Sequence, residues 1–168
     1  MRKFLVLAFA AIVLASCAAA PDESEYYLLT GTEVRAASCE ANLGALDMPD
    51  YLSRTNIVVQ TGTHTLTPAS THRWAEDLGQ ASRRLVSACL NHGTVPTVDI
   101  AVQHLHGSTN GTTMLEATWQ ERGSTDRHTF RSERQQAARG YESLVADHQA
   151  LLTQLCEDIC ATLSRRQP

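Results

Sequence analysis

The stretch TVDIAVQHLHGSTNGTTMLEATWQ, residues 97–120, decides the fold of this chain. Both of its ends alternate apolar and polar residues, which is the side-chain period of a β-strand with one buried face. The apolar positions are Val98, Ile100 and Val102 in the first part and Leu115, Ala117 and Trp119 in the second. The link GSTNG (107–111) carries turn residues. Two antiparallel strands joined by a hairpin are therefore predicted.

Further strand candidates lie on both sides of this hairpin. RHTFRSE (127–133) is short and polar, as is typical of an edge strand. IVVQTGTHTL (57–66) is rich in β-branched residues and interrupted by Gly62, which predicts a strand with a hairpin continuation. YYLLT (26–30) and CEANLGALD (39–47) are shorter strand candidates.

Two segments show the helical period. In residues 72–92, intervals of three and four separate the apolar residues Trp74, Leu78, Ala81, Leu85 and Cys89. Ser70 or Thr71 would cap this helix and Gly93 would end it. A second helix is predicted from about Gly140 to Ser164. The predicted fold is α+β: a mainly antiparallel, mixed sheet with two amphipathic helices packed on one face.

The N-terminus has the features of a targeting segment. Arg2 and Lys3 precede the apolar run from Phe4 to Leu14, whose length suits a signal peptide better than a membrane span, which needs roughly 20 residues. Small residues then lead into Cys17, as in a bacterial lipobox. We expect residues 1–16 to be removed and Cys17 to be lipidated. The alternative is ordinary cleavage after Ala20.

The predicted mature chain divides into two parts. Residues 17–25 form a lipidated tether, and residues 26–168 form a single periplasmic α+β domain. Without Arg2 and Lys3, 12 basic residues stand against 18 acidic residues, a net charge of −6. An acidic domain is a poor candidate for binding nucleic acid, so no nucleic-acid partner is expected. Membrane contact is expected through the N-terminal lipid anchor.

Four cysteines remain after Cys17: Cys39, Cys89, Cys156 and Cys160. An oxidising compartment allows them to form disulfides. Cys156 and Cys160 lie four residues apart on the second predicted helix, where a bond between them is awkward. The plausible frameworks join Cys39 and Cys89 each to one member of this helical pair. The alternative is four buried, reduced cysteines that pack as small apolar side chains.

Catalytic signals are absent from the sequence. It contains no G-x-S-x-G, H-E-x-x-H or S-x-x-K motif and no phosphate-binding glycine loop. His104 and His106 have a spacing that allows a metal pair, but no third ligand stands out nearby. His148 lies on the apolar stripe of the second predicted helix, which indicates a hydrogen-bonded core residue. We predict no enzyme activity, no cofactor and no metal site.

One turn carries an apolar and aromatic group with a cation beside it: Met48, Pro49, Tyr51 and Leu52, followed by Arg54. One interpretation is a loop that closes the end of the core, with Arg54 in a salt bridge. The other is a docking surface for a partner or for a neighbouring copy in a homo-oligomer, with tyrosine and arginine as interface anchors.

The first predicted helix contributes two more candidate contacts. Trp74 and Leu78 suit its core face, whereas Arg73 and Glu76 point elsewhere and are candidates for a surface contact. The tentative partner-binding set is therefore Pro49, Tyr51, Leu52, Arg54, Arg73 and Glu76.

Several segments, taken in order, resemble a known family. They are YYLL (26–29), MPDYLSRTNIV (48–58), RWAEDL (73–78), LEATW (115–119) and GYESLV (140–145). Their order and spacing are similar to those of the PqiC-like auxiliary lipoproteins of ABC-type transport systems. The four later cysteines are not part of that pattern.

The resemblance implies a lipoprotein that docks onto a periplasmic MCE-domain transport protein and serves lipid transport between membranes. It implies no catalysis and no cofactor. Ala18 follows the lipidated cysteine where aspartate commonly signals inner-membrane retention, so the outer membrane is the expected location, with the domain facing the periplasm. The alternative function is an adaptor for envelope assembly, acting on peptidoglycan or outer-membrane biogenesis.

Overall fold

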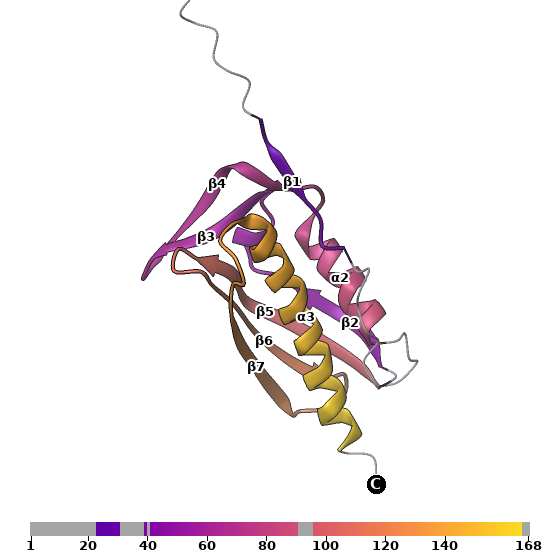
Figure 1. Cartoon of the computed structure of the whole chain (residues 1–168). Helices are drawn as coiled ribbons and strands as arrows, with labels where there is room; N and C mark the ends of the chain where they lie inside the picture. The colour runs from indigo at the N-terminus through magenta and orange to yellow at the C-terminus, as the bar shows by residue number, and fades with distance from the viewer. Residues whose placement is uncertain (1–22, 31–38, 40, 91–95, 166–168) are drawn as a thin grey trace, which may run out of the picture.

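The long β5–β6 hairpin forms the middle of a seven-stranded sheet in the computed structural model, which describes residues 23–30, 39, 41–90 and 96–165 (Figure 1). The strands are β1 (Glu25–Tyr27), β2 (Asn42–Asp47), β3 (Asn56–Gly62), β4 (Thr65–Trp74), β5 (Thr97–Ser108), β6 (Thr112–Glu121) and β7 (Arg127–Gln135). The helices are α2 (Leu78–Cys89) and α3 (Tyr141–Ser164), and a short 3-10 helix, η3, covers Asp50–Leu52.

The strand order is β1-β4-β3-β5-β6-β7, and β2 also pairs with β5. One edge of β5 carries β6 along most of its length. The other edge is shared, because β2 pairs in parallel with Thr97–Ala101 and β3 with Gly107 and Ser108. The long ladders β3–β4, β5–β6 and β6–β7 are antiparallel, whereas the three short ladders are parallel. The predicted α+β fold with a mainly antiparallel, mixed sheet is confirmed.

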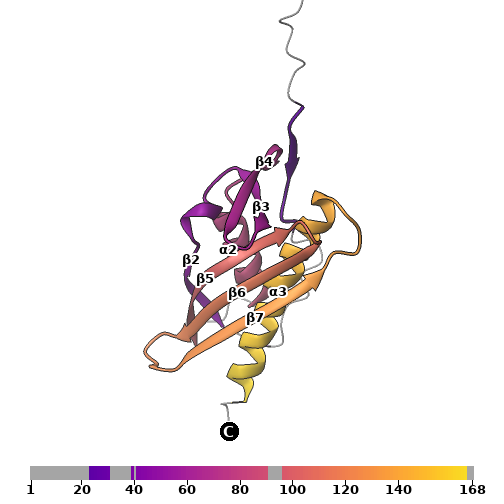
Figure 2. The ribbon, with the colours of Figure 1, turned by 90° about the vertical axis from the view of Figure 1, so that its left-hand side faces the viewer.

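Both helices cover the same face of the sheet, and Figure 2 shows them behind β5, β6 and β7. On β6 the buried residues Leu115, Ala117 and Trp119 face the helices, while the residues between them face the other way. Gly107 brings α3 close to the sheet, because a Cβ at this position would lie 2.3 Å from Leu144 Cδ1. The alternation in the sequence thus gives the sheet one buried and one open face.

The start of the first helix was predicted too early. Residues 72–74 belong to β4, and α2 begins at Leu78. Trp74 pairs with Tyr27 of β1 in a parallel ladder, which is a strand contact. The helix cap is Asp77, whose side chain accepts from the Gln80 N–H at 2.8 Å. Trp74 is still buried, so it packs in the same core as α2 although it belongs to β4. The predicted helix end at Gly93 lies outside the described residues.

The other elements follow the predictions more closely. The segment 57–66 is the β3–β4 hairpin. Of YYLLT, β1 includes only the two tyrosines, and β2 takes the later part of 39–47. The polar strand β7 is at the edge of the sheet, as predicted. The second helix also matches, because α3 starts one residue after Gly140 and ends at Ser164.

Candidate functional site

The apolar turn predicted as a docking surface is the connection between β2 and β3. Pro49 precedes η3 with a φ of −67°, and its carbonyl accepts from the Leu52 N–H at 2.9 Å. Leu52 is buried in the core, with 4% of its surface exposed, whereas Arg54 is exposed. The turn therefore closes the core through Leu52 and presents Arg54 to solvent.

Tyr51 makes two polar contacts at a β-bulge. The β5–β6 register shifts between Val102 and His104. Beyond this shift the Tyr51 hydroxyl accepts a hydrogen bond from the buried Leu105 N–H at 3.1 Å and lies 3.2 Å from His106 Nδ1. Burial, and then the charge of His104, lower the pKa of His106. An unprotonated imidazole nitrogen accepts hydrogen bonds, so this geometry allows the Tyr51 hydroxyl to donate to His106 while it accepts from Leu105.

A hollow of about 320 Å³ lies between this turn and the start of α2. We call it the turn–helix hollow, and it is lined by Leu46, Asp47, Met48, Leu52, Ser53, Asp77, Gly79, Gln80 and Arg83. Arg83 is held in place because its Nη1 donates to the Gly44 carbonyl at 2.8 Å. The hollow is thus lined by apolar side chains, two carboxylates and one cation.

Arg73 and Glu76 do not share a helix surface, so that part of the prediction was wrong. Arg73 is on β4, opposite Asn56 of β3 and Tyr26 of β1, and it is half-buried. Glu76 lies in the loop before α2 and forms an ion pair with Arg84. The reason is the extension of β4 to Trp74, which moves both residues out of the helix. Of these two residues, only Glu76 is adjacent in sequence to a residue that lines the turn–helix hollow, namely Asp77.

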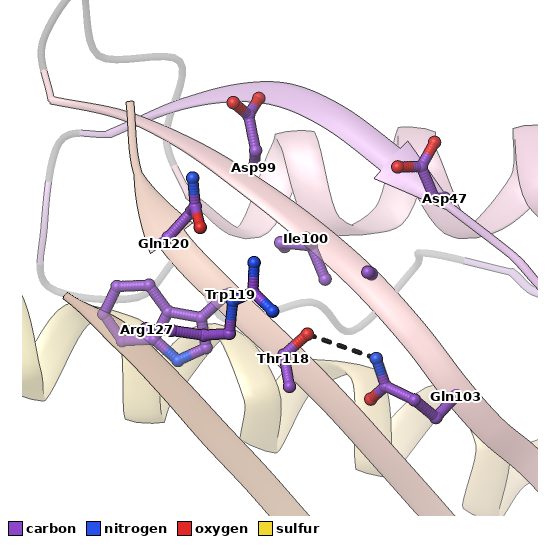
Figure 3. A pocket seen from close by; sticks show the side chains of 9 residues that line it. Asp47, Asp99, Ile100, Gln103, Thr118, Trp119, Gln120 and Arg127 are labelled. Atoms are coloured by element: carbon purple, nitrogen blue, oxygen red, sulfur yellow. Dashed lines mark hydrogen bonds between the residues drawn. The ribbon is translucent and has the colours of Figure 1, made fainter. Parts of the chain in front are cut away.

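A second hollow, of about 330 Å³, lies on the face of the sheet that the helices leave open (Figure 3). Asp99 is fixed at its rim, because it accepts from Arg122 at 2.6 Å and from the Ala45 N–H at 2.7 Å. The hydrogen bond from Arg122 contributes most to the lowered pKa of Asp99. Across the sheet, Gln103 Nε2 donates to Thr118 Oγ1 at 3.1 Å. This hollow was not predicted from the sequence, although polar residues alternate with the apolar ones on β5 and β6.

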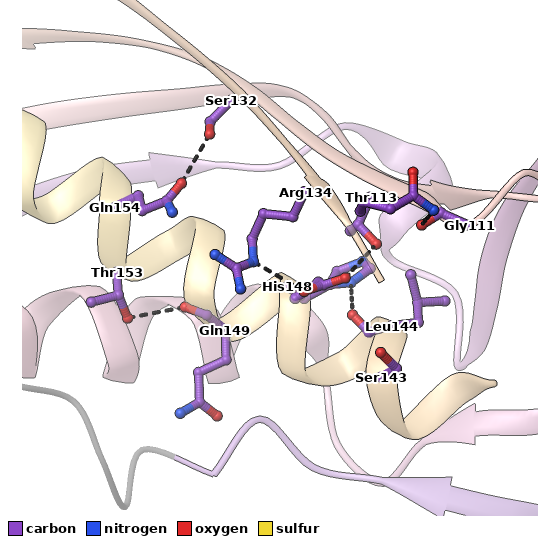
Figure 4. Close-up of polar contacts among 12 residues, drawn as sticks. Gly111, Thr113, Ser132, Arg134, Ser143, Leu144, His148, Gln149, Thr153 and Gln154 are labelled. Atoms are coloured by element: carbon purple, nitrogen blue, oxygen red, sulfur yellow. Dashed lines mark hydrogen bonds and ion pairs between the residues drawn. The ribbon is translucent and has the colours of Figure 1, made fainter. Parts of the chain in front are cut away.

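A buried polar group connects α3 to β6 and β7 (Figure 4). Asp147 is 5% exposed, and it accepts from Arg134 Nε at 3.0 Å and from Thr113 Oγ1 at 3.3 Å. The neighbouring His148 Nδ1 lies 2.7 Å from the Leu144 carbonyl oxygen. The prediction that His148 is a hydrogen-bonded core residue is confirmed. This group holds the helix to the sheet.

His148 should make the stability of the domain depend on pH. Burial lowers its pKa from 6.5 to about 4. Between these values the unfolded chain binds a proton that the folded chain does not. The free energy of unfolding should therefore fall as the pH drops from 6.5 to 4, by up to about 3 kcal/mol at this residue. Urea denaturation at several pH values measures this loss.

His148→Gln is the matched control, because glutamine can donate to the Leu144 carbonyl but does not titrate. The loss of unfolding free energy between pH 6.5 and 4 should be smaller in this variant than in the wild type. Equal losses in both proteins would contradict a neutral, buried His148.

Among the described residues, Cys39 and Cys160 form a disulfide with a Cα–Cα distance of 5.2 Å. This bond is one of those that the sequence left open. Cys89 and Cys156 are buried at the contact between α2 and α3. The sequence alone could not choose between Cys156 and Cys160, since both lie on one helix.

In the described ranges, no three histidine, cysteine or acidic side chains lie close enough to hold a metal ion. Within the same residues, neither α2 nor α3 is long and apolar enough to cross a membrane.

The fold is also found in solved structures. One uncharacterized protein matches with a TM-score of 0.69 and 22% identity, over 83% of this chain and 98% of that chain. Protein XCC0632 from Xanthomonas campestris, of the DUF330 family, matches with a TM-score of 0.63 and 14% identity, over 85% of this chain and all of that one. These matches establish the fold.

The sequence also matches a protein family, which is more specific than a match of fold. A family model described as the ABC-type transport auxiliary lipoprotein component matches residues 27–160. These residues extend from the last residue of β1 to Cys160 of α3, so the match covers most of the described domain. The molecule is of the transport-accessory class, and the chain belongs to the family of ABC-type transport auxiliary lipoprotein components.

Curated relatives agree with this assignment. The chain is 26% identical to the intermembrane transport lipoprotein PqiC of Escherichia coli strain K12, over 86% of this chain and 88% of the relative. The relative of the same name from Shigella flexneri matches with the same figures. The predicted PqiC-like family is confirmed.

Proposed function

We propose that this protein is an outer-membrane lipoprotein that docks a periplasmic MCE-domain protein of an ABC-type lipid transport system. The single observation that carries the proposal is the family match over residues 27–160. The relatives named as intermembrane transport lipoproteins support the transport role. In this proposal the domain acts by binding a partner, not by catalysis.

The proposed location at the outer membrane depends on Cys17, which lies outside the described residues. Residues 1–16 would be removed, and a lipid on Cys17 would hold the chain at the outer membrane. The nine residue-to-residue steps from Cys17 to Tyr26 span at most roughly 30 Å, so β1 would lie close to the bilayer. Tyr26 and Leu28 are 63% and 50% exposed, and an exposed aromatic residue suits a membrane interface.

The proposed docking surface is the η3 turn together with the turn–helix hollow. Arg54 is exposed beside the buried Leu52, and arginine is a common anchor in protein interfaces. Asp47 and Asp77 add negative charge to the hollow, which suits a partner segment with basic and apolar residues. A segment that enters the hollow would contact Met48 and Arg83.

Two substitutions in the turn separate docking from folding. Tyr51→Phe removes the acceptor of the buried Leu105 N–H, so the free energy of unfolding should fall by about 1–3 kcal/mol. Arg54→Ala changes an exposed side chain, so the unfolding free energy should change by less than about 0.5 kcal/mol. Partner binding should nevertheless weaken in the Arg54→Ala variant. Urea denaturation and partner pulldown are the two measurements.

Arg165→Ala is the matched control, because it also removes an exposed arginine but lies at the far end of α3. It should leave both binding and stability unchanged. If Arg54→Ala and Arg165→Ala bind the partner equally well, the η3 turn is not the docking surface.

The proposed function itself is tested by crosslinking the full lipidated chain in intact cells and identifying the captured envelope proteins. Capture of an MCE-domain protein that depends on Arg54 supports the proposal. Capture of peptidoglycan or outer-membrane assembly factors, without an MCE-domain protein, would instead support the adaptor function.

A further inference from the structure

Two thiols meet at the contact between α2 and α3. Cys89 is the last residue of α2, and Cys156 lies in the middle of α3. Both are fully buried. The Cys156 Sγ lies 3.9 Å from the carbonyl oxygen of Val86, which is one helical turn before Cys89. Interaction with the Cys89 side chain is also the largest cause of the raised pKa of the Cys156 thiol, so the two thiols lie close together.

The Cys39–Cys160 disulfide limits the other pairings. Cys160 is one turn after Cys156 on α3, and it is already bonded to Cys39 with a Cα–Cα distance of 5.2 Å. That bond excludes a link from Cys39 to Cys156 and a link from Cys89 to Cys160. The pair that remains is the pair in contact.

We propose that Cys89 and Cys156 form a second disulfide, which joins α2 to α3. Each thiol gives up one proton and one electron, and a bond forms between the two sulfur atoms. The two electrons and two protons pass to the disulfide of a thiol oxidoreductase, which becomes a dithiol. This step rests on the oxidising compartment of the proposed function, but it needs no transporter.

Burial determines when this bond forms. With both side chains fully buried in the packed domain, an oxidoreductase cannot reach them. The hydrogen bond to Cys89, together with burial, also raises the pKa of the Cys156 thiol, so the folded pair is a poor nucleophile. Oxidation therefore precedes the packing of α3 against α2. Afterwards the bond is shielded from reductants, whereas Cys39 of the other disulfide is only half-buried.

Peptide mapping of the full chain, exported to the periplasm of a Gram-negative host, tests the proposal. The protein is alkylated in denaturant without reduction and then digested with trypsin and with a protease that cuts after glutamate. Cleavage after Glu157 separates Cys156 from Cys160. We expect one crosslinked peptide pair with Cys89 and Cys156 and another with Cys39 and Cys160. Alkylated Cys89 and Cys156 in chains that carry the Cys39–Cys160 bond would overturn the proposal.

A double variant, Cys39→Ser with Cys160→Ser, is the matched control. It should retain the Cys89–Cys156 peptide pair, and alkylation of both cysteines in it would count against a bond that forms on its own. In the wild type, a mild reductant applied to the folded protein should release Cys39–Cys160 first. Release of the Cys89–Cys156 pair first would contradict its placement in the core. Since no outcome involves a transport partner, failure here is distinct from failure of the proposed docking.

Discussion

Replacing Cys17 with serine is expected to move the protein from the membrane fraction to the soluble periplasmic fraction. Lipid chains on Cys17 would contribute roughly 0.8 kcal/mol for each buried methylene group. The described helices are not long and apolar enough to replace that anchor. Fractionation of cells, together with mass spectrometry of the mature N-terminus, measures the change.

Ala18→Asp is the matched control for this prediction. The variant keeps the thiol and its lipid, so it should stay in the membrane fraction. In an enterobacterial host it should move from the outer to the inner membrane. A wild-type chain that carries no lipid and starts at Pro21 or later would instead show ordinary secretory cleavage.

Trp119→Ala is expected to lower the free energy of unfolding by about 3–5 kcal/mol. Trp119 is 1% exposed on the core face of β6 and stacks on His128, with 4.2 Å between ring centroids. Alanine would lose the buried area of the indole and leave a cavity that the two flanking strands, β5 and β7, cannot fill without moving. Urea denaturation followed by circular dichroism measures the loss.

Two further variants calibrate this result. Trp119→Phe should cost clearly less than alanine, because the ring volume is largely kept and the buried indole Nε1 has no hydrogen-bond partner among the described residues. Gln120→Ala, one residue further on the open face, should change the unfolding free energy by less than about 0.5 kcal/mol. Similar losses for Trp119→Ala and Gln120→Ala would mean that the two faces of β6 are not distinguished by burial.

The sheet and the second helix were predictable because one face of each is buried. On β6 the alternation of Leu115, Ala117 and Trp119 with polar residues follows directly from the two-residue period of a strand. The same argument with the helical period located α3 to within one residue at its start. Local backbone geometry controls these patterns, so they can be read from neighbouring residues.

At Trp74 the helical period does not correspond to a helix. Its spacing to Leu78 suits a helix, yet Trp74 ends β4 and contacts the same core from a strand. An interval of four residues is compatible with both periods, because residues four apart lie on the same face of a helix and also on the same face of a strand. Pairing of Trp74 with Tyr27 of β1, and of Arg73 with Asn56 of β3, decides in favour of the strand. Those partners are distant in sequence, so no local pattern contains them.

By itself, the sequence determined the strand and helix periods, the acidic balance, and the ordered motifs by which the family was recognised. Only the tertiary structure decided that Tyr51 caps the Leu105 N–H at a bulge and that Cys39 pairs with Cys160. It also revealed the turn–helix hollow between η3 and α2. The physical reason is sequence distance. Periodicity reflects the backbone conformation of adjacent residues, whereas these contacts join residues that come together only when β2 and β3 pair with β5 and the helices pack on the sheet.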